Sequence, residues 1–224
     1  MSTVTVRKCT KKDKDGIVKV CFNTGYMGES AEGHFFDDKL FGQLFCIYYA
    51  RYEANNSFVA VTNENGREKV VGYILCALNT LRYEKDFKRR FLWRILFRLF
   101  FITFWRNNHD FKLVLKFYIK TIKAKEKRDG EMSIYTEYPA HIHIDVLEGY
   151  QRQGIGTKLL KALEAHLKDI KVIGVCLGTS ERNYKSIPFY KKNGFKLLKI
   201  TKGLGFWPDT DDVKSFYFGK KLDD

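Results

Sequence analysis

The most constraining feature of this sequence is a turn that joins an apolar strand to an amphipathic helix. A strand is predicted at His141–Leu147, and a helix at Gly154–Lys168, where apolar residues recur at helical spacing. Glycines at 154 and 156 let a ligand approach the backbone, and the unpaired amides of the first helical turn point toward it. Arg152 adds a cation. The turn is therefore suited to bind a pyrophosphate.

Strands and helices alternate on both sides of this turn. Before it we predict a strand at Thr3–Arg7, helices at Lys11–Phe22 and Asp37–Tyr52, and a β-hairpin of strands Ser57–Thr62 and Lys69–Leu78. After it we predict a strand at Val172–Leu177, a helix at Tyr184–Asn193, and strands at Phe195–Lys202 and Val213–Lys221. This order is typical of a single α/β domain, which we expect to span residues 1–224.

Residues 81–130 differ in composition from the rest of the chain. They hold 15 Lys and Arg against 5 Asp and Glu, and 12 of the 35 aromatic residues. Helices are predicted at Tyr83–Trp105 and Asp110–Lys127, the second with Asn108 or Asp110 as N-cap. Basic residues recur at four-residue intervals, at positions 90, 94 and 98 and at positions 112, 116 and 120, opposite an apolar face. We expect a helical hairpin inserted at 82–136, between the third and fourth strands.

Composition excludes several classes of protein. With 45% hydrophobic residues and 3 Pro, the chain can build one sizeable core or two small ones, so disorder is excluded. Five widely spaced cysteines without a CxxC pair are typical of reduced cytoplasmic thiols, and we expect no metal site. The N-terminal residues contain no apolar leader, and the apolar run Phe91–Trp105 contains two arginines and is shorter than the roughly 20 residues of a membrane span. We expect a cytoplasmic protein without a transmembrane segment.

Two motifs carry a resemblance to a known family. Gln151, Gly154 and Gly156 fit the pattern Q/R-x-x-G-x-G/A, and after the next predicted strand stands Asn183-Tyr-Lys-Ser-Ile-Pro-Phe-Tyr-Lys-Lys-Asn-Gly-Phe. Together they resemble the hallmarks of the GNAT acyl-CoA N-acyltransferases. Within that family, the strand sequence HIHIDVL looks most like the acetyltransferase-like C-terminal domain of O-GlcNAc hydrolases and its free-standing bacterial relatives. The resemblance implies the GNAT fold, a mixed, mostly antiparallel splayed sheet flanked by helices.

The resemblance also implies acetyl-CoA as cosubstrate and a set of residues that hold it. The backbone of Val146 and Leu147 would pair with the pantetheine, and Asn183 and Ser186 would line the opposite wall. Tyr190 would protonate the leaving thiolate, because its ordinary pKa of about 10 suits it to this task; the alternative is that Tyr190 is a core residue of its helix. The pyrophosphate would lie on the backbone amides of Gln151, Arg152, Gln153, Gly154, Ile155, Gly156 and Thr157.

The general base departs from the family pattern. At the two positions where many family members carry Glu or His, this sequence has Ala140 and Ile142. Instead His141, His143 and Asp145 alternate, and so share the other face of the strand. A β-bulge would turn Asp145 or His143 toward the cleft; without one, His141 and His143 would be satisfied core residues, and a water chain could carry the proton. Our catalytic candidates are Tyr190, Asp145 and His143.

Three functions are compatible with these observations. The first is an N-acetyltransferase in which a small-molecule or protein amine attacks the acetyl thioester directly. The second is a catalytically silent acetyl-CoA-binding module, and the third is a basic peripheral adaptor that binds a membrane or nucleic acid through the hairpin. We expect the hairpin to cover the acceptor pocket with its aromatic face and to turn its Arg and Lys stripes outward, where they could contact an anionic surface. A homodimer is also left open.

Overall fold

The structure is a computed structural model that describes residues 3–124, 129–203, 205–210 and 213–222. Within this part of the chain, seven strands form one sheet in the order β1-β2-β3-β4-β5-β7-β6. Every neighbouring pair is antiparallel except β4 and β5, which are parallel. The strands are β1 (Thr5–Lys8), β2 (Phe58–Glu64), β3 (Arg67–Ala77), β4 (Ala140–Val146), β5 (Gly174–Ser180), β6 (Lys196–Lys202) and β7 (Lys214–Lys221).

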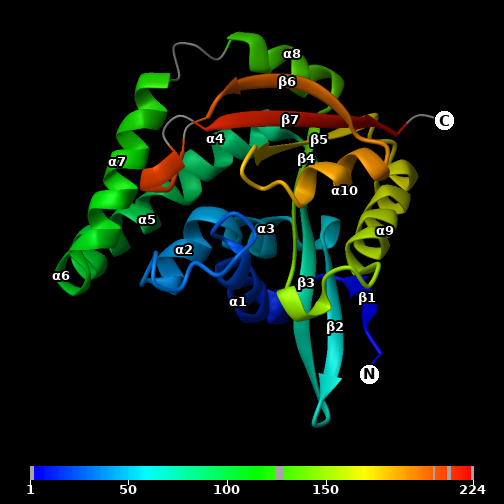
Figure 1. Cartoon of the computed structure of the whole chain (residues 1–224), viewed down its shortest axis with the longest axis horizontal. Coiled ribbons are helices and arrows are strands. Elements are labelled where there is room, and N and C mark those ends of the chain that lie inside the picture. Colours follow the sequence, from blue (N-terminus) through cyan, green and yellow to red (C-terminus); the bar gives the residue numbers. More distant parts are fainter. Residues whose placement is uncertain (1–2, 125–128, 204, 211–212, 223–224) are drawn as a thin grey trace.

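The sheet is divided at the β4–β5 pair. These strands pair only at Ala140–Val175 and His141–Cys176, so the rest of β4 diverges from β5. Figure 1 shows the result: β2 and β3 run steeply inclined to β6 and β7, and the two parts of the sheet splay apart. This mixed, mostly antiparallel, splayed sheet is the architecture that the sequence predicts.

Helices cover both faces of the sheet because each strand alternates its side chains between two cores. On β3, Tyr73 and Leu75 join a core with α1 (Lys14–Thr24), α2 (Asp38–Phe45) and α3 (Ile47–Tyr52). Ile74 and Cys76 join the other core, which contains α9 (Ile155–Asp169) and Tyr190 of α10 (Ser186–Lys192). In Figure 1, α1 and α9 accordingly lie on opposite sides of β2 and β3. Short 3₁₀ turns occur at Lys11–Asp13, Ala54–Asn56, Glu148–Tyr150 and Pro208–Thr210.

The segment between β3 and β4 is helical, but its first arm is not the single helix that we predicted. It consists of α4 (Thr80–Arg90), α5 (Leu92–Arg98), a π-helical turn (Leu99–Thr103) and α6 (Phe104–Arg106). The return arm is α7 (Asn108–Ala124), and a further helix, α8 (Asp129–Glu137), precedes β4. The side chain of Asn107 accepts hydrogen bonds from the amides of His109 and Asp110, so Asn107 caps α7 rather than Asn108 or Asp110.

A cluster of buried polar groups fixes the hairpin to the rest of the protein. Arg98 donates to Asp37 through Nε (2.9 and 3.0 Å) and Nη2 (2.6 Å), and Thr103 Oγ1 donates to the same carboxylate at 2.7 Å. Asp110 accepts from the backbone amides of Phe36 and Asp37 at 2.9 and 2.7 Å. The prediction that the whole arginine stripe faces outward is therefore wrong at Arg98, because Asp37 supplies an anion inside the protein.

The pKa of Asp37 reports the same contacts. Burial alone would raise the pKa of this carboxyl, but the hydrogen bonds from Arg98 and Thr103, together with the Leu40 amide at the start of α2, lower it overall. A lowered pKa means that the ionised form contributes stability above the ordinary pKa of an aspartate, and that this contribution is lost as the pH falls through the lowered value. Arg98 and Asp37 are therefore expected to stabilise the fold at neutral pH.

We predict that Arg98→Leu lowers the free energy of unfolding by about 3 kcal/mol, because Asp37 keeps its charge in a buried position without its cation. Urea denaturation followed by circular dichroism measures this change. The control is Arg89→Leu, which removes an exposed ion pair with Asp86 and should cost less than about 0.5 kcal/mol. Equal stability of Arg98→Leu and the wild type would contradict a stabilising role for the ion pair between Arg98 and Asp37.

Candidate active site

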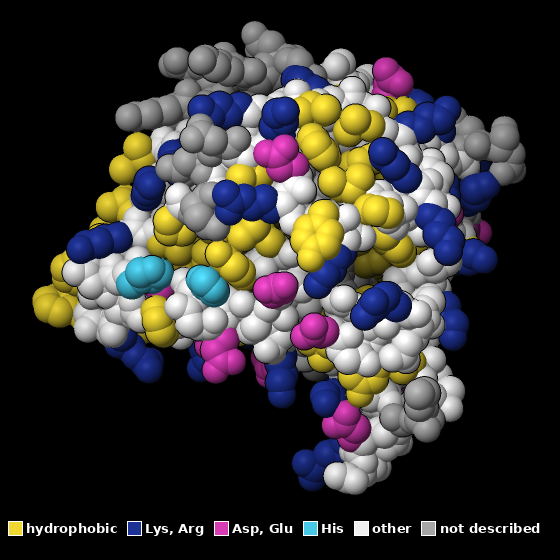
Figure 2. Space-filling view, in the orientation of Figure 1, with side chains coloured by type: hydrophobic (Ala, Val, Ile, Leu, Met, Phe, Trp, Pro, Cys, Tyr) yellow, Lys and Arg dark blue, Asp and Glu magenta, His cyan; other side chains and the backbone are white. Residues whose placement is uncertain are grey.

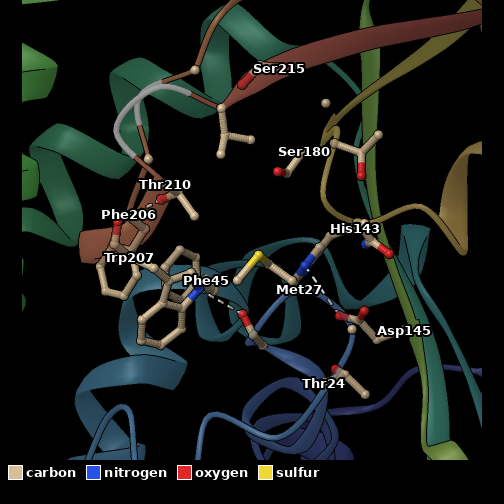
Figure 3. Close-up of a pocket in the computed structure, with 18 of the residues that line it drawn as sticks. Thr24, Met27, Phe45, His143, Asp145, Ser180, Phe206, Trp207, Thr210 and Ser215 are labelled. Carbon is tan, nitrogen blue, oxygen red and sulfur yellow. Dashed lines mark hydrogen bonds and ion pairs between the residues drawn. The ribbon is translucent and has the colours of Figure 1, made fainter.

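A cavity of about 420 Å³ opens where β4 and β5 diverge. Its walls come from the end of α1 and the turn that follows, from α2, from β4 and β5, from α10, and from the loop between β6 and β7. Figure 3 shows part of this lining, with polar groups of β4 and β5 on one side and aromatic rings on the other. The labelled residues are Thr24, Met27, Phe45, His143, Asp145, Ser180, Phe206, Trp207, Thr210 and Ser215.

His143 and Asp145 lie side by side in the cavity wall. His143 Nε2 is 3.3 Å from Asp145 Oδ2 (Figure 3), Tyr73 donates its hydroxyl proton to the same oxygen at 2.5 Å, and His143 Nδ1 lies 3.4 Å from the Tyr73 hydroxyl. The pairing of β3 with β4 is continuous from Ala77–His141 to Gly72–Val146, without the bulge that we considered. No bulge is required, because the cavity lies on the face of β4 that these two residues share.

Burial shifts the acid–base properties of this strand. Removal from water raises the pKa of the Asp145 carboxyl, and His143 and the Tyr73 hydroxyl offset this shift only in part. The carboxylate is thereby made a better proton acceptor. His141, two residues before His143, hydrogen-bonds to Tyr49 (2.5 Å) and to Thr80 Oγ1 (3.1 Å), and burial lowers its pKa to about 4. His141 is thus a neutral, half-buried residue with both ring nitrogens hydrogen-bonded.

The turn before α9 has the backbone that a pyrophosphate site requires. Gly154 has a φ of +76°, and a side chain there would meet no atom within 4 Å, so the glycine is needed for its backbone conformation and not for space. No side chain among the described residues caps α9, so the first amides of the helix point into solvent at its positive end. Arg152, with a φ of +59°, is at the same turn.

The side chains of this turn fix its shape. Gln151 donates to the carbonyl of Val146 at 2.9 Å, and Gln153 donates to the carbonyl of Gly149 at 3.0 Å. The amide of Leu147 donates to the carbonyl of Val71 at 2.9 Å and so continues the pairing of β4 with β3 past Val146. Gly156 has a packing role, because a Cβ there would lie 3.2 Å from the Phe189 ring of α10. Ile155 is buried and Thr157 is half-buried in the first turn of α9.

The second motif contributes the opposite wall. Asn183 and Tyr190 line the cavity. Ser186 instead hydrogen-bonds to Thr179 Oγ1 (3.1 Å) and to the Asn183 carbonyl (2.8 Å), so it holds the turn between β5 and α10. Tyr190 is also a core residue, with its ring 5.8 Å from that of Phe218, so the two interpretations of it do not exclude each other. Burial raises the pKa of its phenol, which therefore stays protonated at neutral pH.

Sequence reasoning did not find the aromatic wall of the cavity. Phe206 and Trp207 stand in the loop between β6 and β7, and Trp207 Nε1 donates to the Gly25 carbonyl at 3.3 Å (Figure 3). Their neighbours Phe41 and Phe45 come from α2. The glycine-rich, Trp-containing loop was the available signal, but nothing local in it shows which helix it packs against. From the sequence we expect Asp211 and Asp212 of this loop to favour a cationic acceptor amine, but both residues lie outside the described part of the chain.

The hairpin supports this wall and does not line the cavity. None of the lining residues in the described chain belongs to 80–137. Instead Phe117 of α7 packs with its ring centroid 5.2 Å from that of Phe206, and Lys120 Nζ is 3.5 Å from the carbonyl of Gly205. The expectation that the aromatic face of the hairpin covers the pocket is therefore wrong, because Phe206 and Trp207 occupy that place.

Neither a metal-binding cluster nor a membrane-spanning helix occurs among the described residues. His, Cys, Asp and Glu side chains form no group of three or more there that could hold a metal ion. None of the helices in the same part of the chain is long and apolar enough to cross a membrane.

Comparison with known proteins identifies the family. Residues 29–195 match the model of the acetyltransferase (GNAT) family. Because the match spans more than half of the chain, the chain belongs to this family, as its two motifs predict. Enzymes of the family use acetyl-CoA as acetyl donor.

Solved structures support the same fold. SsHAT matches with a TM-score of 0.71 and 21% identity, over 99% of this chain and 100% of that one. Ard1 from Thermoplasma volcanium matches with a TM-score of 0.57 and 15% identity, over 99% of each chain. Chaetomium thermophilum Naa20 in complex with a bisubstrate analogue matches with a TM-score of 0.53 and 18% identity, over 97% of this chain and 86% of that one. At these identities the likeness shows the fold alone.

One curated relative is similar in sequence over a shorter stretch. It is an N-alpha-acetyltransferase of Saccharolobus solfataricus, 38% identical over 73 residues. The aligned part is 32% of this chain and 42% of the relative, so the chain spans less than half the length of that protein.

We predict that His141 makes the fold sensitive to acid. Its pKa is lowered from 6.5 to about 4, so the unfolded state binds more protons between these values, and stability is lost as the pH falls through this window. From pH 7 to pH 5 the wild type should lose about 2 kcal/mol more unfolding free energy than His141→Gln, which cannot titrate. Urea denaturation at both pH values measures this. The same pH dependence of stability in His141→Gln and in the wild type would contradict the lowered pKa of His141.

Proposed function

We propose that this protein transfers the acetyl group of acetyl-CoA to a primary amine by direct attack of the amine on the thioester. One observation carries the proposal: the cavity at the β4–β5 divergence brings His143 and Asp145 of β4 together with Tyr190 of α10. A proton acceptor and a proton donor thus face one space. The family to which the chain belongs supports the same reaction.

The described residues fit acetyl-CoA. The amides at the start of α9, with Gly154 in its left-handed conformation and Arg152 beside it, would hold the pyrophosphate. The edge of β4 that β5 leaves unpaired, at Val146 and Leu147, would lie along the pantetheine, with Asn183 on the other side. When bound, acetyl-CoA supplies an activated acetyl group. The thioester would then reach the cavity beside Tyr190.

The protein groups would move two protons. As the amine nitrogen forms its bond to the acetyl carbon, the His143–Asp145 pair accepts the proton that the nitrogen loses. Tyr190, which burial keeps protonated, donates its phenolic proton to the sulfur as the carbon–sulfur bond breaks, so that CoA leaves as a neutral thiol. The proton taken up by the His143–Asp145 pair then returns through water to the Tyr190 phenolate. Free CoA and the acetylated amine are the products.

The acceptor that we propose is an α-amine with an apolar neighbouring group. Met27, Phe45 and Phe206 face the cavity, whereas His143 and Asp145 supply its titratable groups. An α-amine has an ordinary pKa of about 8, so a larger fraction of it is neutral at pH 7 than of a lysine amine near 10.4. The name of the Saccharolobus solfataricus relative supports this choice.

Four expectations from the sequence stay predictions: kinship with the acetyltransferase-like domain of O-GlcNAc hydrolases, a cytoplasmic location, a homodimer, and the organisation of residues 1–224 as one domain. A silent acetyl-CoA-binding module stays the rival function, and it differs from our proposal in having no turnover with any amine.

We predict that Gly154→Val weakens acetyl-CoA binding by about tenfold or more, because a β-branched residue disfavours the left-handed backbone of the turn. Isothermal calorimetry with acetyl-CoA measures the affinity. The matched control is Gly66→Val in the β2–β3 turn, where φ is +78° and a side chain also meets nothing within 4 Å. Gly66→Val should lose stability but keep its affinity. Unchanged affinity of folded Gly154→Val would contradict the site.

Removal of the Tyr190 hydroxyl tests the proposed acid. Tyr190→Phe keeps the ring in the core and should lower the turnover number roughly 10²- to 10⁴-fold, with little change in acetyl-CoA affinity. Thiol release during acetylation of short peptides with free N-termini measures turnover. Tyr184→Phe changes an exposed tyrosine of the same motif and should behave as the wild type. Equal rates of Tyr190→Phe and the wild type would remove Tyr190 from the mechanism.

A further inference from the structure

The outer face of the hairpin carries large aromatic side chains that the protein itself leaves uncovered. Between 43% and 78% of the surface of each is exposed, and Trp105 is the most exposed. They recur at three- to four-residue spacing along α5, the π-helical turn and α6, so they share one side of the arm. We call this set the aromatic patch; it consists of Trp93, Phe97, Phe100, Phe101, Phe104 and Trp105.

The patch is continuous and not a scatter of single rings. Phe97 stacks on Phe101 with centroids 4.9 Å apart, and Phe100 and Phe104 both contact Phe111 of α7, at 5.4 and 5.0 Å. α7 extends the apolar surface with exposed side chains at Tyr118, Ile119 and Ile122. In Figure 2, hydrophobic side chains accordingly gather along the left edge of the molecule, over α6 and α7, with Lys and Arg side chains between them.

A rotation of the hairpin cannot bury these rings. The opposite side of the same arms is already packed in the core through Phe91, Ile95 and Leu99. The buried ion pair between Arg98 and Asp37 fixes that orientation. Apolar side chains on two opposite sides of a helix are expected where one side packs in the protein core and a binding partner covers the other.

Charge indicates what covers the outer side. Residues 81–130 hold 15 Lys and Arg against 5 Asp and Glu, and exposed basic side chains flank the patch at Arg89, Arg106 and Lys112. Arg94 lies over the Trp93 ring at 4.8 Å, and its Nε is buried without a hydrogen-bond partner among the described residues. A second copy of this chain would bring the same positive charge against the patch, so an anionic partner is favoured.

We propose that the hairpin docks the protein on an anionic lipid membrane, with the aromatic patch in the interface and the basic side chains at the headgroups. Trp and Phe beside Arg and Lys is the side-chain combination of helices that lie in the plane of a membrane surface. The proposal is independent of the acetyl transfer proposed above.

Vesicle binding by the full-length protein tests the proposal. We expect cosedimentation with phosphatidylglycerol vesicles, much weaker binding to phosphatidylcholine vesicles, and a loss of binding as salt is raised. Trp93 and Trp105 are exposed and the third tryptophan, Trp207, is buried, so tryptophan emission should shift to shorter wavelength when phosphatidylglycerol vesicles are added. No binding to either vesicle, or no shift on binding, would overturn the proposal.

A matched pair of variants locates the contact. Phe101→Ser combined with Trp105→Ser should weaken binding to phosphatidylglycerol vesicles by about tenfold or more while the melting temperature stays within a few degrees, because both rings are exposed. Ile170→Ser combined with Ile173→Ser removes exposed apolar side chains elsewhere and should bind as the wild type. Unchanged binding of the hairpin variant would overturn the proposal. So would a wild-type dimer that this variant converts to a monomer, or binding of duplex DNA in preference to vesicles.

Discussion

β4 and β5 pair at two positions only, and the space that they leave between them determines where every candidate functional group lies. A strand edge without a partner exposes backbone groups that bind an extended ligand, and here one edge ends at the glycine turn of α9. β4 presents His143 and Asp145 to the space, and α10 presents Tyr190 from the other side. Had the strands paired along their full length, the cavity and the facing proton donor and acceptor would be lost together.

The sequence predicted those features that depend on local spacing. The turn at Gly154, the order of strands and helices, and the shared face of His143 and Asp145 follow from periods of two and 3.6 residues and from the conformational freedom of glycine. The splayed sheet and the family followed from the two motifs, which are themselves local. The alternation of side chains along β4 does not reveal which of its two faces borders the cavity, because that depends on where α1 packs.

The features that were missed depend on contacts between distant parts of the chain. Phe206 and Trp207 close the cavity because they pack on α2, about which their own loop contains no information. Arg98 belongs to a stripe that looks solvent-exposed, and only the fold brings it to Asp37. The same contact turns the aromatic patch outward. Phe117 then links the hairpin to Phe206, so the membrane-facing element that we propose also supports the wall of the cavity.

The central claim is that amine and thioester meet in one cavity and react directly. Cys21 also lines that cavity, and a route through an acetylated cysteine would release CoA before the amine binds. Initial rates measured while both acetyl-CoA and a peptide amine are varied distinguish the two routes. Direct transfer predicts double-reciprocal lines that intersect, because both substrates must be bound together. Parallel lines would contradict it by showing a covalent intermediate, and the absence of turnover with every amine would contradict the enzymatic function itself.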